Sequence, residues 1–272
     1  MEYATVQGVD VPKVGLGTWR MEGEACRGAV ETALDLGYRH VDTAQVYENE
    51  REVGRAIAAS DVDRDDVFLT TKVNPREAGY DDLLLSVGRS LERLGTDYVD
   101  LLLLHWPNPL VRIGETMDAM ATLVDRGVAR HVGVSNFNVR RLKKARRVAD
   151  VPVFADQVQF HPYSPQRDLL RYCQREDVLL TAYSPLAQGN MLRDDVVTDI
   201  GRKYDRSPAQ VAVRWATQHR NVVTIPKSTS REHLRENLNV FDFKLTREEV
   251  ERITRPSRLK TGATMVRGML GS

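Results

Sequence analysis

Side chains that could carry acid–base or nucleophilic chemistry occur at the ends of short apolar segments that have the composition of β-strands. Asp42 closes the second such segment, Lys72 the third and His105 the fourth. Burying a lysine without a partner is costly, so Lys72 needs a carboxylate, and Asp42 on the neighbouring strand is the natural candidate. A lysine in such a site can also form a Schiff base with a carbonyl compound. These three residues are therefore the first candidates for a reaction centre.

The same pattern continues through the second half of the chain. Polar residues follow or end the fifth to eighth apolar segments, namely Ser135, Asn136, Gln157, Tyr183, Ser184, Lys227 and Ser228. Taken singly, each has an ordinary alternative. Asp42, Ser135 and Asn136 could cap the following helices, and His105 could be a core histidine with satisfied hydrogen bonds. The set as a whole is much harder to explain by accident, which favours one shared site.

The elements that must position these residues alternate between short apolar runs and longer amphipathic segments. We predict strands at Val14–Trp19, Tyr38–Asp42, Val67–Lys72, Tyr98–His105, His131–Ser135, Val153–Val158, Leu179–Ser184 and Val222–Ile225. We predict helices at Glu24–Leu36, Glu50–Ala59, Leu83–Leu94, Glu115–Arg126, Arg140–Ala149, Arg167–Arg175, Pro208–Gln218 and Arg231–Val240. Eight strand–helix units without a break in composition favour an α/β fold, a closed (β/α)8 barrel, over an open doubly wound sheet. The strand ends would then converge on the face of the barrel where active sites lie.

Short additions flank these units. Residues 5–12 alternate around Gly8, which predicts a small hairpin that could plug the N-terminal end of the barrel. An extra helix is predicted at Arg247–Ile253, followed by a tail, residues 256–272, that could act as a lid over the substrate. We expect a single domain over residues 1–272.

Bulk properties exclude several classes of function. The formal net charge of +1 over 272 residues gives no general electrostatic reason to expect a nucleic acid or an anionic membrane as partner. Only two cysteines occur, so a secreted disulfide framework is not expected. The sequence lacks a signal-peptide pattern and an apolar run of about 18 residues. We expect a soluble, cytoplasmic monomer without a metal site.

Several motifs, in this order, resemble the aldo-keto reductase superfamily. They are Gly15-Leu16-Gly17-Thr18-Trp19, Gly37-Tyr38-Arg39-His40-Val41-Asp42-Thr43-Ala44, Tyr47-Glu48-Asn49-Glu50, Leu102-Leu103-Leu104-His105-Trp106-Pro107, Gly133-Val134-Ser135-Asn136-Phe137 and Ile225-Pro226-Lys227-Ser228. The resemblance covers about residues 3–253, and the chain is most similar to compact prokaryotic members of the 2,5-diketo-gluconate reductase type. It implies reduction of small aldehydes and ketones by hydride transfer from a nicotinamide cofactor.

The resemblance implies that Asp42, Tyr47, Lys72 and His105 are the catalytic residues. Hydride addition to a carbonyl carbon leaves an alkoxide that needs a proton, so a general acid must lie within hydrogen-bond reach. Tyr47 would be that acid, although a free tyrosine has a pKa of about 10. We expect the ammonium of Lys72, held by Asp42, to lower the pKa of Tyr47. His105 would donate a hydrogen bond to the carbonyl oxygen.

The resemblance also implies an extended cofactor across the barrel mouth. Ser135, Asn136 and Gln157 would bind the carboxamide, and Tyr183 would stack on the nicotinamide ring. The loop from Ser184 to Asn190 would cover the pyrophosphate. The full set of implied contacts is Thr18, Trp19, Asp42, Ser135, Asn136, Gln157, Tyr183, Ser184, Pro185, Leu186, Gln188, Gly189, Ile225, Pro226, Lys227, Ser228, Arg231, His233, Glu236 and Asn237. Glu236 and Asn237 match the adenine-contacting pair of the superfamily.

The eighth strand bears on the choice between NADP and NAD. Lys227, Ser228 and Arg231 precede or begin the last barrel helix, where Thr229 and Glu232 could form a capping box, and such a cationic helix start suits a 2′-phosphate. NADP-specific members usually carry an arginine where this chain has His233, and an imidazole cannot match a bidentate guanidinium. We therefore expect NADPH to be preferred, with measurable use of NADH.

Two further features remain. We expect Trp19, Tyr47, His105 and Trp106 to contact the substrate, and we expect Trp215 to be a core residue. Asp156 precedes Gln157 where an asparagine is common in the superfamily.

Two other functions stay open at this point. A barrel aldolase could form a Schiff base at Lys72 or Lys227. A cofactor-binding regulatory or structural barrel would have little activity, although such proteins usually lose catalytic residues, and all four are present here.

Overall fold

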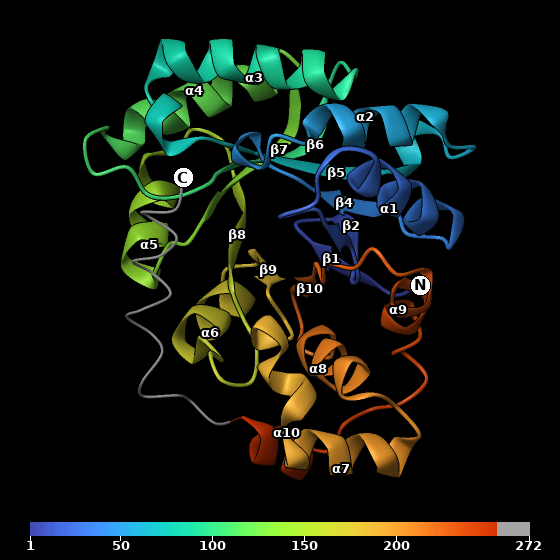
Figure 1. Ribbon diagram of the computed structural model, residues 1–272. Coiled ribbons are helices and arrows are strands. Elements are labelled where there is room, and N and C mark those ends of the chain that lie inside the picture. The colour runs from blue at the N-terminus through green and yellow to red at the C-terminus, as the bar shows by residue number, and fades with distance from the viewer. Residues whose placement is uncertain (255–272) are drawn as a thin grey trace.

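The computed structural model describes residues 1–254, and its centre is a barrel of eight parallel strands (Figure 1). The strands are β3 (Leu16–Gly17), β4 (His40–Asp42), β5 (Phe68–Val73), β6 (Val99–Leu104), β7 (Ala129–Ser135), β8 (Val153–Gln159), β9 (Leu179–Tyr183) and β10 (Val222–Thr224). Each strand pairs with its neighbours in chain order. The predicted α/β barrel is confirmed.

The barrel closes where the first strand region meets the last. The Gly15 amide donates to the Thr224 carbonyl at 2.8 Å, and the Thr224 amide donates to the Lys13 carbonyl at 2.8 Å. Gly17 lies at the same seam, where a Cβ would approach the Ile225 carbonyl oxygen to 2.6 Å. Glycine is therefore required at this position by close contact between two backbones.

Helices form the layer outside the strands, and most of them bury one apolar face against the rest of the protein. They are α1 (Gly23–Asp35), α2 (Glu50–Ala59), α3 (Tyr80–Leu94), α4 (Ile113–Asp125), α5 (Val139–Val148), α6 (Arg167–Arg175), α7 (Asp195–Tyr204), α8 (Pro208–Thr217), α9 (Arg231–Leu238) and α10 (Arg247–Ile253). Short 3-10 segments connect some of them: η1 (Gln45–Tyr47), η2 (Arg64–Asp66), η3 (Pro75–Glu77) and η4 (Ala187–Arg193). The expected extra helix α10 is present, and Trp215 is in the core as predicted, with 1% of its surface exposed.

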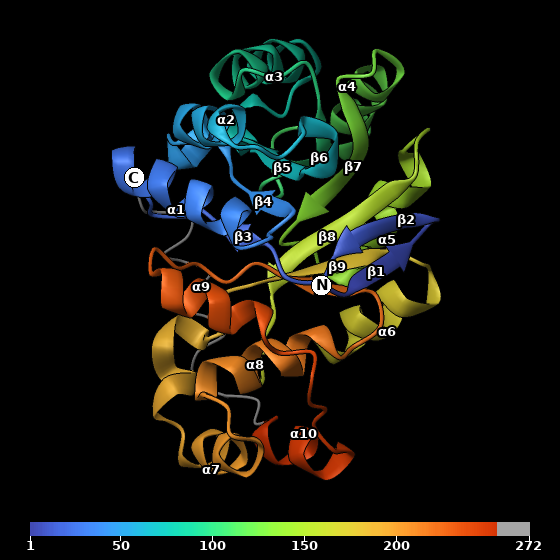
Figure 2. The ribbon, with the colours of Figure 1, turned by 90° about the vertical axis from the view of Figure 1, so that its right-hand side faces the viewer.

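The predicted hairpin plug is also present. Strands β1 (Tyr3–Val6) and β2 (Val9–Pro12) pair antiparallel around a two-residue turn with positive φ at Gln7 (49°) and Gly8 (79°). Val6 and Val11 pack against interior residues of the barrel, including Leu101 and Phe154. Figure 2 shows the hairpin at the end of the barrel where the strands begin, opposite the predicted site.

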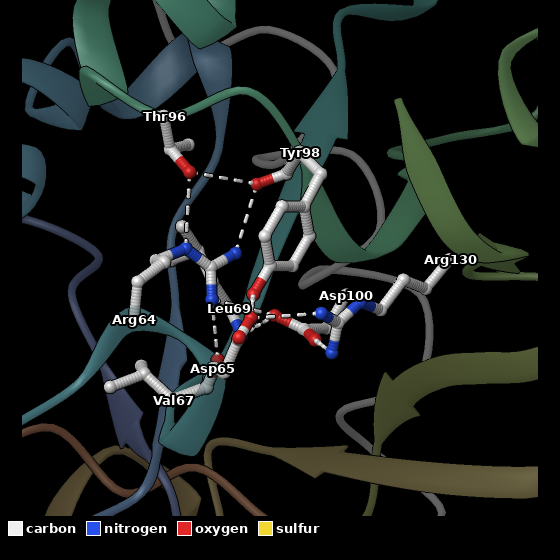
Figure 3. A network of polar contacts seen from close by, with 8 residues as sticks. All are labelled: Arg64, Asp65, Val67, Leu69, Thr96, Tyr98, Asp100 and Arg130. Carbon is white, nitrogen blue, oxygen red and sulfur yellow. Dashed lines mark hydrogen bonds and ion pairs between the residues drawn. The ribbon is translucent and has the colours of Figure 1, made fainter. Parts of the chain in front are cut away.

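A polar network ties three barrel strands together near their starts (Figure 3). Asp100 on β6 accepts from Arg64 at 3.0 Å, from Arg130 at 3.2 Å and from the Leu69 amide at 2.9 Å. Both guanidinium groups lie over the ring of Tyr98, each 4.1 Å from its centroid. Because active sites of this fold lie at the opposite end of the barrel, we interpret the network as a structural clamp between β5, β6 and β7.

Two predictions need comment. The capping box from Thr229 to Glu232 is wrong: the cap of α9 is Ser230, whose hydroxyl accepts from the His233 amide. The tail that we expected to form a lid, residues 256–272, lies outside the described residues.

Two global features complete the description. Cys26 and Cys173 are both free and buried. Among residues 1–254, no helix is both long and apolar enough to cross a bilayer.

Candidate active site

Lys72 lies at the centre of the candidate site and is fully buried near the end of β5. Its ammonium donates to Asp42 Oδ1 at 2.6 Å, to the Thr43 carbonyl at 2.9 Å and to Tyr47 Oη at 3.3 Å. These three bonds use all three donors of the ammonium. The predicted ion pair between Lys72 and Asp42 is confirmed, and it places the phenol of Tyr47 directly beside the buried cation.

Tyr47 reaches this position because a buried amide holds the loop after β4. The Thr43 hydroxyl donates to Asn49 Oδ1 at 2.7 Å, and Asn49 Nδ2 donates to the Thr18 and Met21 carbonyls, both at 2.9 Å. Our sequence reasoning included Asn49 in a motif but gave it no role. The carbonyls that it bonds, at Thr18 and Met21, lie on another loop, so no local signal could have identified them.

Gln45 anchors the other end of the same loop. Its Nε2 donates to Ser86 and Ser90 of α3 at 3.2 and 3.0 Å, and its Oε1 accepts from the Asn74 amide at 2.7 Å. This residue was also missed. The available signal was the pair Ser86 and Ser90, two small polar residues one helical turn apart on the buried face of α3.

His105 follows β6 and is only 8% exposed. The centroids of the His105 and Tyr47 rings are 5.5 Å apart, with an angle of 77° between the ring planes. Burial, helped by the charge of Lys72, lowers the pKa of His105 to about 3. The imidazole is therefore neutral at pH 7, and a neutral imidazole can donate one hydrogen bond without carrying charge.

The predicted carboxamide residues share one network with Asp42. Gln157 Nε2 donates to Asp42 Oδ2 at 2.6 Å, so both oxygens of Asp42 have a partner. The backbone carbonyl of Gln157 accepts from the Ser135 hydroxyl at 2.8 Å and from the backbone amide of Asn136 at 2.9 Å. The ends of β4, β7 and β8 are thereby fixed relative to one another.

Asn136 connects this network to the histidine. Its backbone is left-handed, with φ of 63°, and its Nδ2 donates to the His105 carbonyl at 3.0 Å and to Ser135 Oγ at 2.9 Å. The Tyr183 hydroxyl donates to Asn136 Oδ1 at 2.8 Å. A non-glycine residue keeps this conformation only where its surroundings hold it, and these bonds do so.

The protonation states follow from burial and charge. Burial raises the pKa of Tyr47, and this effect exceeds the opposing effect of the Lys72 ammonium. Our prediction of a lowered pKa for Tyr47 is therefore wrong in net direction, although Lys72 acts in the predicted sense. Burial alone would lower the pKa of Lys72, but Asp42 and Tyr47 outweigh it and raise that pKa. The pair is a neutral phenol beside a charged ammonium.

The loop after β9 contains several left-handed residues. Positive φ angles occur at Ser184 (52°), Ala187 (48°), Gln188 (56°) and Gly189 (89°). The Ala187 and Gly189 amides donate to the Ser184 and Leu186 carbonyls of the same loop, both at 2.9 Å. The loop that we expect to cover the pyrophosphate is therefore held by its own backbone hydrogen bonds.

The expected phosphate residues near α9 are exposed. Lys227 Nζ donates to the Arg20 carbonyl at 3.2 Å. Arg231 Nη2 lies 2.7 Å from Asp35 Oδ2 in an ion pair whose side chains are 64% and 63% exposed. Exposed pairs of this kind are worth roughly 0–1 kcal/mol, so Asp35 competes only weakly for Arg231. His233 is exposed on the same helix.

The remaining residues predicted to contact the cofactor or the substrate differ in how far they are exposed. Trp19 is 43% exposed and stacks with Arg20, whose guanidinium carbon lies 4.2 Å from the ring centroid. The half-buried residues are Trp106, Leu186, Ser228 and Glu236, and the buried ones are Thr18, Pro185, Ile225, Pro226 and Asn237. Within residues 1–254, no cluster of three or more His, Cys, Asp or Glu side chains could hold a metal ion.

Comparison with known proteins agrees with this geometry. The model of the Aldo/keto reductase family matches residues 13–257. The chain is 42% identical over 249 residues to the 9,11-endoperoxide prostaglandin H2 reductase of Trypanosoma cruzi (strain CL Brener), covering 90% of this chain and 87% of that protein. It is 41% identical over 247 residues to the glyoxal reductase of Bacillus subtilis (strain 168), covering 90% and 89%.

A solved structure supports the same assignment. The crystal structure of a 2,5-diketo-D-gluconic acid reductase B-like protein superimposes with a TM-score of 0.91 at 42% identity, over 93% of this chain and 91% of that chain. A family model that spans most of the chain, relatives above 40% identity and a common barrel all agree. The chain therefore belongs to the aldo/keto reductase family.

Proposed function

We propose that this oxidoreductase reduces small aldehydes and ketones to alcohols with NADPH, and that Tyr47 donates the proton. One observation carries the proposal: the Tyr47 hydroxyl lies 3.3 Å from a buried, carboxylate-paired ammonium and beside a neutral imidazole. This combination supplies a proton donor, a charge that stabilises the resulting phenolate, and a second hydrogen-bond donor for a carbonyl oxygen.

The residues at the barrel mouth fit a nicotinamide dinucleotide. Asn136 and Gln157 are amide side chains of the kind that pairs with a carboxamide. The loop from Ser184 to Asn190 follows the end of β9, where it would cover a pyrophosphate. Lys227 and Arg231 would hold the 2′-phosphate. When bound, the nicotinamide supplies the hydride.

The chain's own residues handle the proton. As charge develops on the carbonyl oxygen, Tyr47 Oη gives up its proton, and the Lys72 ammonium stabilises the phenolate that is left. Asp42 keeps Lys72 charged and in place, and Gln157 keeps Asp42 in place. His105, neutral over the physiological range, donates to the same carbonyl oxygen and orients it.

Substrate class rests on the relatives and on the exposed Trp19. The glyoxal reductase and the prostaglandin H2 reductase differ greatly in what their names say they reduce, and this chain is about equally similar to both. We expect a permissive site for small, reactive carbonyl compounds. A Schiff-base role for Lys72 is disfavoured, because its three donors are bonded and its raised pKa leaves it protonated.

The decisive variant is Tyr47→Phe. We expect kcat for aldehyde reduction to fall by about 10²–10⁴-fold, since the general acid is lost while the ring remains. NADPH affinity, measured by quenching of tryptophan fluorescence, should stay within about twofold. Tyr3→Phe, at a tyrosine that is 49% exposed, is the matched control. Wild-type turnover in Tyr47→Phe would overturn the proton-donor role.

A further inference from the structure

Helices α5 and α6 lie next to each other on the outer layer (Figure 1). Residues of both helices line a second concave surface, outside the barrel mouth. This groove has a volume of about 650 Å³. Five of its lining residues are cations, Arg140, Lys143, Arg167, Arg171 and Arg175, and only one is an acid, Asp168. None of them belongs to the candidate active site.

The cations come from both helices that line the groove, Arg140 and Lys143 from α5 and the other three from α6. On α6, Arg167, Arg171 and Arg175 are spaced four residues apart and therefore share one face of the helix. The opposite face buries Leu169 and Cys173 against the barrel, so the arginine row cannot turn inward. Like charges at this spacing destabilise a helix, by about 0.2–0.5 kcal/mol per pair.

Most of these cations have no carboxylate partner among the described residues. Arg140, Lys143 and Arg167 form no ion pair within residues 1–254, and the contact of Arg171 with Asp168 is long, at 3.9 Å. The fifth cation, Arg175, does pair with Glu176, at 3.0 Å. Within residues 1–254, the groove thus concentrates positive charge that is only partly compensated by carboxylates.

The sequence concentrates charge in the same place. Residues 138–176 contain nine of the 39 Lys and Arg residues but only four of the 38 Asp and Glu residues. The other residues of the chain carry a small negative excess. The positive field around residues 138–176 attracts anions even though the whole chain is nearly neutral.

We propose that the groove between α5 and α6 binds a small compound that carries several phosphate groups, of the linear oligophosphate class. Its volume is that of a small-ligand pocket. Guanidinium groups bind phosphate oxygens in a bidentate manner, and a bound polyanion would relieve the repulsion among these cations.

The walls of the groove favour this ligand over a nucleic acid. Tyr172, the only aromatic residue among the described residues of the lining, is 5% exposed and so offers no face on which a base could stack. In addition, Gln166, the residue before α6, provides no side-chain cap, so the first N–H groups of α6 are free of a capping side chain.

The test is calorimetric titration with sodium tripolyphosphate at low, constant ionic strength. The groove variant is Arg140→Gln/Lys143→Gln/Arg171→Gln. The matched control is Arg141→Gln/Lys144→Gln/Arg147→Gln, which removes the same charge from exposed positions of α5 that do not line the groove. We expect the groove variant to bind at least about 30-fold more weakly than wild type, and the control to stay within about threefold. Circular dichroism establishes that each variant is folded.

Four results would overturn the proposal. Equal weakening in both variants would mean general attraction to a basic helix. Unchanged affinity in both would mean binding elsewhere, including at Lys227 and Arg231, which both variants retain. Failure of the wild-type protein to bind tripolyphosphate would show that the groove is not a phosphate-binding site. A 12-nucleotide single strand that binds more tightly than tripolyphosphate, with the same dependence on the groove, would make a nucleic acid the occupant.

Discussion

Asp156 and Gln157 illustrate how adjacent residues of one strand take opposite roles. Side chains alternate along β8, and Gln157 points into the barrel to bond Asp42. Asp156 points to the other side, where it is completely buried, accepts from the Phe137 amide at 3.4 Å and has its pKa raised well above its ordinary value by burial. Burial therefore favours the neutral form of this acid, which stands where the superfamily usually has an asparagine.

Cofactor choice is decided at the scale of single side chains. We expect wild type to have a higher kcat/KM with NADPH than with NADH. Lys227→Gln should raise the KM for NADPH by about tenfold and leave the KM for NADH unchanged, because one charge-assisted hydrogen bond to the 2′-phosphate is worth about 1.5 kcal/mol. Initial rates with both cofactors measure this.

Lys244→Gln, at an exposed lysine away from the site, is the control for the loss of one charge. A strict preference of the wild-type protein for NADH would show that Lys227 and Arg231 do not serve a phosphate.

The directions of the pKa shifts were the part of the site that the sequence could not supply. Lys72, Asp42 and Tyr47 could be grouped from their strand ends and from the family resemblance. How deeply each group is buried depends on the packed barrel, and burial decides the pKa of Tyr47 and of His105. The positioning residues Asn49 and Gln45 escaped prediction for a related reason: their partners are distant in sequence.

At the scale of elements, hydrophobic periodicity predicted every strand of the barrel and nearly all of its helices. The exception is α7, whose core sequence Val196-Val197-Thr198 is β-branched and disfavours a helix. Tertiary packing and the cap by Asp194, which accepts from the Val196 and Val197 amides at 2.9 and 3.2 Å, override that preference. The cap of α9 was misplaced by one residue because Thr229 and Ser230 are both suitable caps.

Because the clamp around Asp100 is structural, we expect its loss to lower the stability of the protein and to leave kcat almost unchanged. Asp100→Ala leaves the Leu69 amide and the guanidinium groups of Arg64 and Arg130 without their acceptor, so we expect a loss of about 2–3 kcal/mol in the free energy of unfolding. Because the clamp lies at the opposite end of the barrel, kcat should stay within about twofold. Urea unfolding and steady-state rates test the two parts separately.

Asp65→Ala is the control for this clamp. Asp65 bonds Tyr98 and Arg130 in the same network, but its side chain is 78% exposed, so its loss should cost less than about 1 kcal/mol. An equal loss in both variants, or a kcat that falls with Asp100→Ala, would contradict the interpretation of the network.

At the scale of the whole molecule, burial of histidines makes stability depend on pH. Burial lowers the pKa of five of the six histidines: His40, His105, His131, His161 and His219. An unfolded histidine takes up a proton near pH 6.5, whereas folded His161, with a pKa of about 4, does not until the pH is much lower. The unfolded state therefore binds more protons below pH 6.5, and stability falls as the pH falls through that window.

His161→Gln isolates one of these contributions. Between pH 7 and pH 5 the free energy of unfolding of the wild-type protein should fall by about 2 kcal/mol because of His161 alone. The variant should lack this part of the pH dependence. Urea unfolding at both pH values measures it. His233→Gln, at an exposed histidine, should change nothing, and identical pH dependence in His161→Gln and wild type would contradict the prediction.

The seam between Lys13 and Thr224 has a consequence for biosynthesis. A nascent chain cannot complete the ring of strands until residue 224 has left the ribosome, and at about 5–20 residues per second this takes on the order of ten to fifty seconds. During that time β3 has no partner on one side, so an exposed strand edge is available for pairing with other chains. Pairing between such edges is bimolecular, so a lower concentration of incomplete chains should improve the yield of folded protein.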